Sequence, residues 1–273
     1  MPANQADLFL YNYKLHWLAN ICLRLAFFSL LSASLWADNH ALQNDKLTVA
    51  VAANFLHAFK EIQEQYTEET GIKVITSHAA TGQLYHQIRH GAPFDIFLSA
   101  DRKTSQRLIN EKLALASSYF VYARGRLVLW SADQSIELAN GGRLTKLDKN
   151  TAIAMANPKI APYGKAAQQV LEQLDAQQNR RATIVTGQNI TQTYQFIASG
   201  NAAMGFISLA QLRAIESAHK KENYWLVPES LHDPIEQSAV VIARSKKAIL
   251  ANNFLNFLRS PKALNIMQKY GYR

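Results

Sequence analysis

Short apolar runs alternate with longer helical periods along this chain. Residues 47–51 form a nearly continuous apolar run, which is typical of a strand buried on both faces of a sheet. Apolar residues then recur at helical spacing from Phe55 to Tyr66, and Gly71 ends that period. Asn54 lies between the two, where a helix N-cap is expected. The strand–turn–helix order predicts an α/β protein.

A complete strand–helix–strand unit follows over residues 74–101. Residues 74–76 predict a strand, residues 84–91 a helix that ends at a glycine, and residues 94–98 a second strand. Thr81 and Gly82 lie in the polar turn before the helix. Their hydroxyl and backbone N–H groups stand at the positive end of that helix, which suits either an ordinary N-cap or an anion.

The same pattern restarts after Gly125, where two predicted strands meet and we expect the chain to enter a second lobe. A late strand at residues 235–243 is expected to return to the first lobe. The predicted fold is therefore α/β, with a ligand cleft between two α/β lobes at the carboxyl ends of the strands. We place lobe 1 at residues 44–125 and 232–273, and lobe 2 at residues 126–231.

Composition narrows the possible functions. The chain has 273 residues, 48% of them hydrophobic, which is enough for one large core or two smaller ones. Its formal net charge of +9 is dispersed, with no run of five like charges and no basic face carrying aromatic residues. This pattern argues against a nucleic-acid partner.

Residues 1–37 have the features of a signal peptide. Lys14 and Arg24 precede or flank a short apolar run, and small residues lead to a possible cleavage point after Ala37. An uncleaved membrane anchor is the alternative, but the apolar run is short for a span. Cys22, the single cysteine, lies in this segment, so the mature chain would contain no disulfide and no cysteine metal site. We expect a periplasmic protein.

Four turns between a strand and a helix share one kind of chemistry: those at Asn54, Thr81, Tyr163 and Ile190, two in each predicted lobe. They offer an amide, two hydroxyls and backbone N–H groups, with no Lys or Arg at the tip and no carboxylate. Neutral donors at helix ends suit a fully ionised tetrahedral dianion, whereas hydrogen phosphate would need an acceptor for its proton. Two lobes closing on one small ligand would form a hinged trap.

Eight segments together resemble the periplasmic molybdate-binding proteins of ABC importers: residues 52–55, 80–84, 91–95, 98–101, 125–131, 157–164, 187–190 and 268–272. The resemblance covers nearly everything from about Lys46 to Arg273. It implies a type II periplasmic-binding-protein fold that holds molybdate or tungstate, without a cofactor or enzymatic activity, and a membrane permease as partner. We also expect a monomer.

Carried over residue by residue, the resemblance implies ligand contacts at Asn54, Thr81, Tyr163 and Ile190, the last through its backbone N–H. Further possible contacts are Ala53, Gly82 and Ser208. Some family members carry a tyrosine ligand where Ser208 stands, whereas here the phenol comes from Tyr163, which makes Ser208 doubtful. Sulfate or another tetrahedral oxyanion is the alternative ligand.

Three other functions are less consistent with the sequence: a cation site, a related enzyme and a regulator. His86 and His90 are spaced four apart on a predicted helix, but no acidic residue precedes His90, so an exposed polar face is favoured over a cation site. Asn189 begins a glycosylation motif that would be silent in a bacterial periplasm. Two other classes use related folds: a porphyrin-precursor synthase that anchors its cofactor through cysteine, and a ligand-sensing regulator. The cysteine-free mature chain disfavours the synthase, and the leader disfavours the regulator.

Overall fold

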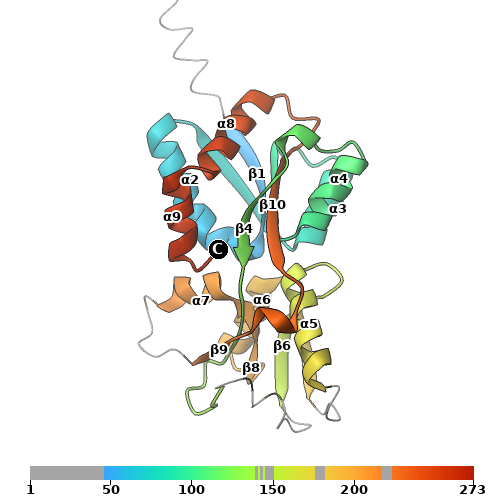
Figure 1. Cartoon of the computed structure of the whole chain (residues 1–273), viewed down its shortest axis with the longest axis vertical. Helices are drawn as coiled ribbons and strands as arrows, with labels where there is room; N and C mark the ends of the chain where they lie inside the picture. The colour runs from blue at the N-terminus through green and yellow to red at the C-terminus, as the bar shows by residue number, and fades with distance from the viewer. Residues whose placement is uncertain (1–45, 139–140, 142–143, 145–150, 176–181, 217–222) are drawn as a thin grey trace, which may run out of the picture. The chain divides into compact units, whose positions relative to one another are not determined.

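The computed structural model describes residues 46–138, 141, 144, 151–175, 182–216 and 223–273 (Figure 1). The predicted signal peptide, with Cys22, lies outside these residues. Lys46–Arg273 forms one compact unit. Within the described ranges, no helix has the length and apolar character needed to cross a membrane.

A mixed sheet of five strands, in the order β2-β1-β3-β10-β4, organises what we call lobe 1. β1 pairs in parallel with both β2 and β3, whereas β10 runs antiparallel to β3 and β4. The late strand therefore lies in the first sheet, as the sequence predicted. The strands are β1 (Lys46–Ala52), β2 (Lys73–Ala79), β3 (Ile96–Ser99), β4 (Phe120–Gly125) and β10 (Ile235–Val241).

A second mixed sheet of five strands, in the order β7-β6-β8-β5-β9, organises lobe 2. β6 pairs in parallel with β7 and β8, and β5 runs antiparallel to β8 and β9. The two sheets have the same layout, and the predicted α/β class is confirmed. The strands are β5 (Leu127–Trp130), β6 (Ala152–Ala156), β7 (Thr183–Gly187), β8 (Met204–Ser208) and β9 (Tyr224–Leu226).

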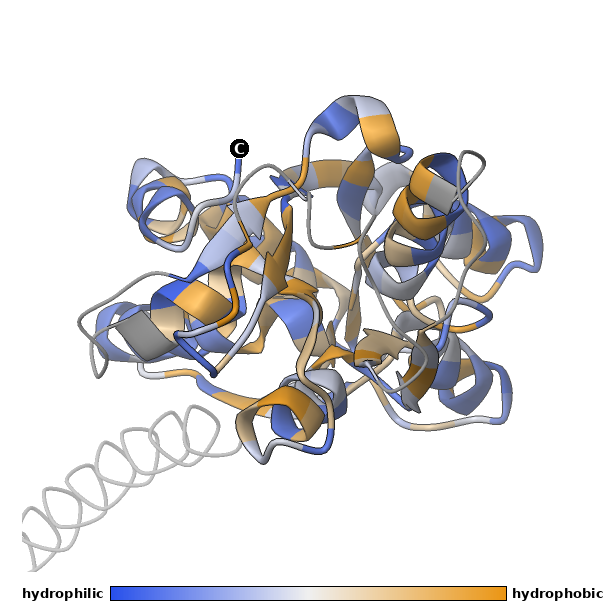
Figure 2. Cartoon of the chain, turned by 90° about the horizontal axis from the view of Figure 1, so that it is seen from below, coloured by the Kyte–Doolittle hydropathy of each residue, from blue (hydrophilic) through white to orange (hydrophobic). Residues whose placement is uncertain are grey.

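Helices cover both sheets. In lobe 1 these are η1 (Ala53–Phe55), α2 (Leu56–Thr70), α3 (Thr81–Arg89), α4 (Arg102–Asn110), η2 (Ala116–Ser118), α8 (Ala248–Leu258) and α9 (Pro261–Lys269). In lobe 2 they are α5 (Pro162–Asp175), α6 (Ile190–Ala198), α7 (Leu209–Glu216) and η4 (Glu229–Leu231). Apolar residues gather on the strands, and hydrophilic residues are frequent on the outer helices (Figure 2).

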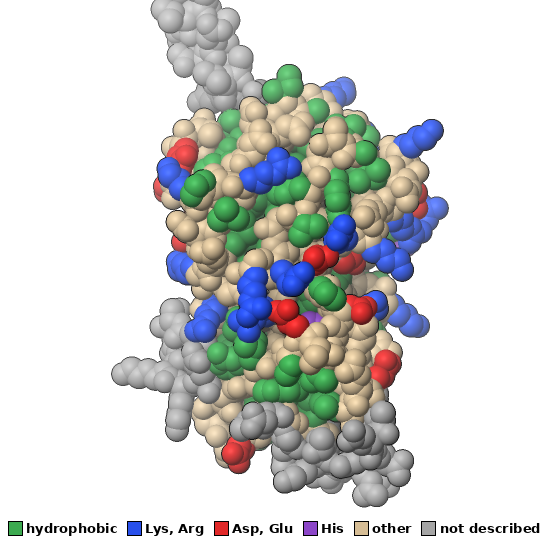
Figure 3. Space-filling view, in the orientation of Figure 1, with side chains coloured by type: hydrophobic (Ala, Val, Ile, Leu, Met, Phe, Trp, Pro, Cys, Tyr) green, Lys and Arg blue, Asp and Glu red, His purple; other side chains and the backbone are tan. Residues whose placement is uncertain are grey.

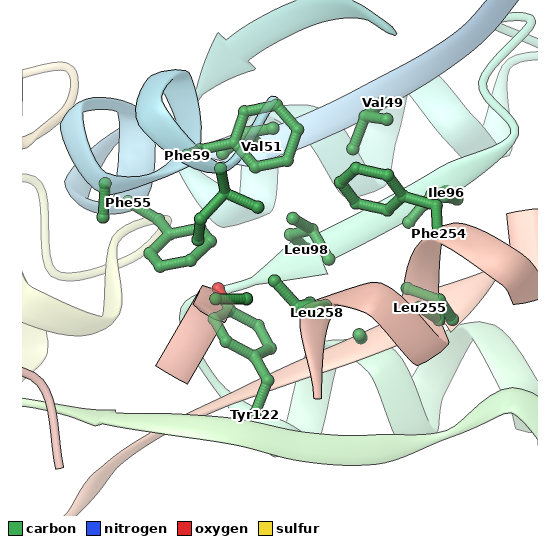
Figure 4. Close-up of a cluster of buried hydrophobic side chains, with 14 of the residues drawn as sticks. Val49, Val51, Phe55, Phe59, Ile96, Leu98, Tyr122, Phe254, Leu255 and Leu258 are labelled. Carbon is green, nitrogen blue, oxygen red and sulfur yellow. The ribbon is translucent and has the colours of Figure 1, made fainter. Parts of the chain in front are cut away.

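The core of lobe 1 lies on both faces of its sheet. On one face, aromatic residues of α2 and α8 such as Phe59 and Phe254 pack over Val49 and Val51 of β1 (Figure 4). On the other face, α3 and α4 contribute a separate cluster that includes Leu84. Burial at this scale is the main favourable contribution to folding, at about 25 cal/mol per Å² of apolar surface. The helix ends at the sheet edge are therefore held on a rigid scaffold.

Asn54 is not a helix N-cap, and that prediction was wrong. It lies in the 3-10 turn η1, and α2 begins one residue after Phe55 with no side-chain cap. The Asn54 side chain instead donates to Gln237 of β10, at an N–O distance of 2.9 Å. A partner 183 residues away in sequence replaces the local cap. The predicted helix itself is confirmed, and it ends at Gly71, whose φ of 72° is left-handed.

The chain crosses between the sheets on either side of Arg126 and again between β9 and β10. β4 ends at Gly125 and β5 begins at Leu127, so the predicted crossing at Gly125 is confirmed. Ion pairs surround the crossings, where charged side chains gather on the visible face (Figure 3): Arg124–Glu236 at 3.1 Å, Arg124–Glu229 at 3.9 Å and Arg273–Glu229 at 3.1 Å. Exposed pairs of this kind contribute roughly 0–1 kcal/mol each. The lobe boundaries given from the sequence stay a prediction.

Candidate ligand-binding site

The four predicted turns all lie at the carboxyl ends of strands that pair in parallel. Asn54 follows β1 and Thr81 follows β2, while Tyr163 follows β6 and Ile190 follows β7. The carboxyl ends of parallel neighbours meet at the same edge of a sheet, so each lobe presents two turns together. One buried apolar cluster joins the two lobes at these turns, and it includes Ala53, Ala80, Tyr163 and Ile190.

Gly82 makes a direct contact between the lobes. Its N–H donates to the carbonyl oxygen of Ile160, which precedes α5, at 2.8 Å. A Cβ atom on Gly82 would stand 3.0 Å from the Ile160 Cα, closer than side chains normally approach. The glycine therefore permits the start of α3 to touch the opposite lobe, and its N–H is used in that contact.

Asn54 is almost fully buried in lobe 1, with 2% of its surface exposed. Its Nδ2 donates to Gln237 at 2.9 Å and lies 3.4 Å from the hydroxyl oxygen of Tyr272. The Tyr272 hydroxyl itself donates to the Asn54 carbonyl oxygen at 2.8 Å. An amide carries two N–H groups, and the Gln237 bond uses one of them in good geometry. The other makes the longer bond to Tyr272, which a ligand acceptor at this position would replace.

Thr81 is held so that its hydroxyl proton is available. It is buried at the start of α3, and its Oγ1 accepts a hydrogen bond from the Ala100 N–H at 3.1 Å. A hydroxyl has one proton to donate and two lone pairs to accept with. Because the Ala100 bond uses a lone pair, the Thr81 proton remains free to donate.

Tyr163, the second residue of α5, carries a buried hydroxyl that makes no hydrogen bond of good geometry among the described residues, although the amides of Asn54 and Gln237 lie near it. Burial and the nearby phenols of Tyr272 and Tyr122 raise its pKa well above the ordinary value, and the neighbouring amides of Asn54 and Gln237 oppose this rise. The phenol therefore keeps its proton at neutral pH. It is a donor in a dry site, which is costly unless an acceptor arrives.

Ile190 begins α6 in lobe 2 and is buried. The Asn189 side chain caps the helix by accepting from the N–H groups of Thr191 and Gln192, at 2.9 and 3.0 Å. The N–H of Ile190 comes before these two and has no acceptor within the helix. It also stands at the positive end of the helix dipole, where anions bind favourably.

Ser208 differs from the four turn residues because its hydroxyl is already engaged. Its Oγ donates to the Gln211 side chain at 3.2 Å and accepts from the Gln211 N–H at 3.1 Å. Gln211 in turn donates to the Ile190 carbonyl oxygen at 3.1 Å. Ser208 therefore supports the start of α6 through Gln211, and its proton is committed to that side chain.

Sequence reasoning missed Gln237, which is fully buried in β10. Its Oε1 accepts from Asn54 at 2.9 Å and from the Tyr122 hydroxyl at 3.0 Å, and its Nε2 has no partner among the described residues. The available signal was weak, because Gln237 stands between Glu236 and Ser238 at the polar start of the strand. Tyr272 belongs to the segment 268–272 that resembles the family, but the sequence does not predict its bond to Asn54.

Two surface grooves run along the line where the lobes meet, each with a volume of about 280 Å³. Both are lined by residues of the two lobes, including Asp101, Lys103, Pro162 and Lys165. Of the candidate ligand residues, only Gly82 borders one of them. The donor cluster around Tyr163 thus lies inward of the grooves, in keeping with its burial.

His86 in α3 and His90 just after it are both exposed, and the two residues contact each other. His90 Nδ1 lies 2.7 Å from the His86 carbonyl oxygen. In the described part of the chain, no group of three or more His, Cys, Asp or Glu side chains could hold a metal ion.

Comparison with known proteins agrees with this architecture. Residues 47–273 match the family described as bacterial extracellular solute-binding protein. The chain is 41% identical over 232 residues to the molybdate-binding protein ModA of Azotobacter vinelandii, covering 85% of this chain and 91% of that protein. It is also 41% identical over 227 residues to ModA of Rhodobacter capsulatus, covering 83% and 88%.

Solved structures extend the comparison to the fold. The periplasmic molybdate-binding protein of Azotobacter vinelandii superposes with a TM-score of 0.75 at 36% identity, over 83% of this chain and 98% of that one. The sulfate-binding protein SubI of Mycobacterium tuberculosis gives 0.72 at 14% identity, over 84% and 87%, and shares the fold alone. This chain therefore belongs to the family of bacterial extracellular solute-binding proteins.

Proposed function

We propose that this protein is the solute-binding component of an ABC transporter, and that it captures molybdate or tungstate in the periplasm and delivers it to a membrane permease. The observation that carries the proposal is the Tyr163 hydroxyl, a buried donor without an acceptor that lies beside the Asn54 amide where the lobes meet. The names of the two relatives at 41% identity support molybdate as the ligand.

The donor chemistry favours a fully ionised tetrahedral oxyanion. Asn54, Thr81, Tyr163 and Ile190 supply uncharged donors from both lobes, and within the described residues no hydrogen bond of their side chains involves a carboxylate. Charge-assisted bonds from such donors to a buried dianion are worth roughly 1.5–3 kcal/mol each. Ala53 lies in the same cluster and adds a backbone N–H, whereas the Gly82 N–H is shared with Ile160.

Calorimetric titration of the purified mature protein with molybdate, tungstate, sulfate and phosphate tests this proposal. We expect tight binding of molybdate and tungstate, weaker binding of sulfate and no binding of phosphate. Sulfate binding tighter than molybdate binding would support the alternative, a carrier of sulfate or another tetrahedral oxyanion. Absence of binding by all four would contradict the proposed function.

The proposal also includes export, a monomeric state and binding without catalysis. We expect the mature chain to begin near Asp38, because the predicted cleavage point follows Ala37. N-terminal sequencing of the exported protein tests the cleavage, and a chain that retains residues before Leu25 would contradict it.

Light scattering of the mature protein tests whether it is a monomer. Recovery of unchanged molybdate after incubation tests the absence of catalysis.

A further inference from the structure

Gln237 satisfies only half of its amide although it is fully buried. Its Oε1 accepts two hydrogen bonds, from Asn54 at 2.9 Å and from Tyr122 at 3.0 Å. Its Nε2 carries two N–H groups and has no acceptor among the described residues. A buried donor without a partner lowers the stability of the folded protein by about 1–3 kcal/mol. An acceptor close to Nε2 would remove this cost.

That acceptor is the hydroxyl oxygen of Tyr163. Both groups lie beside the backbone of Gly125: a Cβ atom there would overlap the Tyr163 hydroxyl and stand 2.8 Å from Gln237 Nε2. The Tyr163 hydroxyl also makes no hydrogen bond of good geometry in the described chain, so two incompletely paired polar groups are neighbours in one buried site. Nε2 therefore lies where it can donate to a lone pair of the phenol, and the Gln237 amide already acts to lower the pKa of Tyr163.

We propose that Gln237 is a positioning residue for the oxyanion site: in the ligand-bound form its Nε2 donates to the Tyr163 hydroxyl oxygen and turns the phenol proton toward the ligand. Its Oε1 meanwhile holds the Asn54 amide in lobe 1. One side chain from β10 thus orients donors from both lobes. This inference rests on the proposed function, because the ligand completes the geometry.

An amide performs both tasks at this position at any pH near neutrality. Glutamate keeps the acceptor for Asn54 and Tyr122 but replaces the donor with a carboxylate that competes for the phenol proton. Methionine has a similar length and keeps the volume, but it provides neither a donor nor a strong acceptor. The two substitutions therefore separate the donor from the packing of the side chain.

A double-mutant cycle between Gln237→Met and Tyr163→Phe tests the inference through molybdate affinity. If Gln237 acts through the phenol, Gln237→Met weakens molybdate binding by roughly tenfold or more in the parent. In the Tyr163→Phe background the same substitution should cause a loss at least fivefold smaller than in the parent. Equal losses in the two backgrounds would mean that the residues act independently, and would overturn the inference.

Ser238→Ala is the matched control for the loss of a buried polar group. Ser238 is adjacent in β10 and fully buried, and its hydroxyl contacts the Asp101 carbonyl oxygen and Ser105, away from the site. We expect it to lower the melting temperature while leaving molybdate affinity within about twofold of the parent. A loss of affinity as large as that of Gln237→Met would mean that any weakening of β10 has this effect, and would overturn the inference.

Gln237→Glu provides a second readout and replaces the methionine variant in the cycle if that variant does not fold. We expect at least tenfold weaker molybdate binding at pH 9, where the ionised carboxylate accepts the hydrogen bond of the phenol, and partial recovery at pH 6.5 as the buried carboxyl group protonates. The parent should change by less than about twofold over this range. A pH profile of Gln237→Glu that follows the parent would overturn the inference.

The proposed function and this inference fail in different ways. A parent protein that binds none of the four oxyanions would overturn both. A parent that binds molybdate, together with additive losses in the cycle, would overturn the role of Gln237 and leave the proposed function intact.

Discussion

The Tyr163 hydroxyl lies directly against Gly125, so that a side chain on the glycine would overlap it. Tyr163 belongs to α5 of lobe 2, and Gly125 is the last residue of β4 in lobe 1, at the crossing into the second sheet. The phenol of Tyr163 is therefore packed onto the strand that leads from one sheet to the other. This contact links the position of the phenol to the relative position of the lobes.

Gly125→Ala should weaken molybdate binding by at least tenfold. The added methyl group would collide with the Tyr163 hydroxyl and crowd Gln237 Nε2, both of which are buried and cannot simply turn outward. The lobes would then close incompletely. Titration measures the affinity, and small-angle scattering with ligand measures the closure. A variant that binds and compacts like the parent would show that the contact is not needed for closure.

Molybdate should stabilise the folded protein by mass action and hold the lobes together. At a ligand concentration of 100 times Kd the gain is about 2.7 kcal/mol, which corresponds to a rise in melting temperature of roughly 5–10 °C for a protein of this size. Differential scanning calorimetry measures the rise, and small-angle scattering should show a more compact bound form. If neither quantity changed, a site between the lobes would be ruled out.

Tyr163→Phe and Ser208→Ala should differ strongly in their effect on molybdate affinity. The first removes a free buried donor and should cost tenfold to hundredfold, with little loss of stability, since a charge-assisted bond is worth roughly 1.5–3 kcal/mol. The second removes a hydroxyl already bonded to Gln211 and should cost less than about threefold. Titration of both variants checks the order, and the reverse order would place the fourth ligand at Ser208.

Stability should fall at alkaline pH because several phenols are buried, among them the three around the candidate site. Burial raises the pKa of Tyr122, Tyr163 and Tyr272 in the folded state, whereas an unfolded tyrosine titrates near about 10. Their stabilising effect is fully present below that value. Above it, protons leave the unfolded state first, so the free energy of unfolding falls until the folded phenols also titrate.

Urea unfolding at pH 8, 10 and 11 measures this fall. Each phenol contributes up to about 1.4 kcal/mol per pH unit above pH 10, so Tyr163→Phe should reduce the slope by about that amount. An unchanged slope in Tyr163→Phe would mean that its phenol titrates alike in both states.

The elements that carry the site could be predicted from local pattern. Three local patterns predict a strand end or a helix start to within a few residues: the apolar run before Asn54, the break at Gly125 and the turn at Tyr163. All three agree with the elements of the structure. Parallel pairing then brings the turns to the same sheet edge by a general rule. The fold class and the placement of the four turns at the strand ends needed nothing more than the sequence, whereas the ligand contacts at these turns stay a prediction.

The partners of those residues were decided only by tertiary structure. Asn54 looked like an N-cap because a cap is a local arrangement, yet its amide binds Gln237, which is 183 residues away, and its carbonyl accepts from Tyr272, which is 218 residues away. Hydrogen bonds over such separations leave no periodic signal in the sequence. They form because burial removes water as an alternative partner, so each polar group must take whichever donor or acceptor the packed lobes bring within reach.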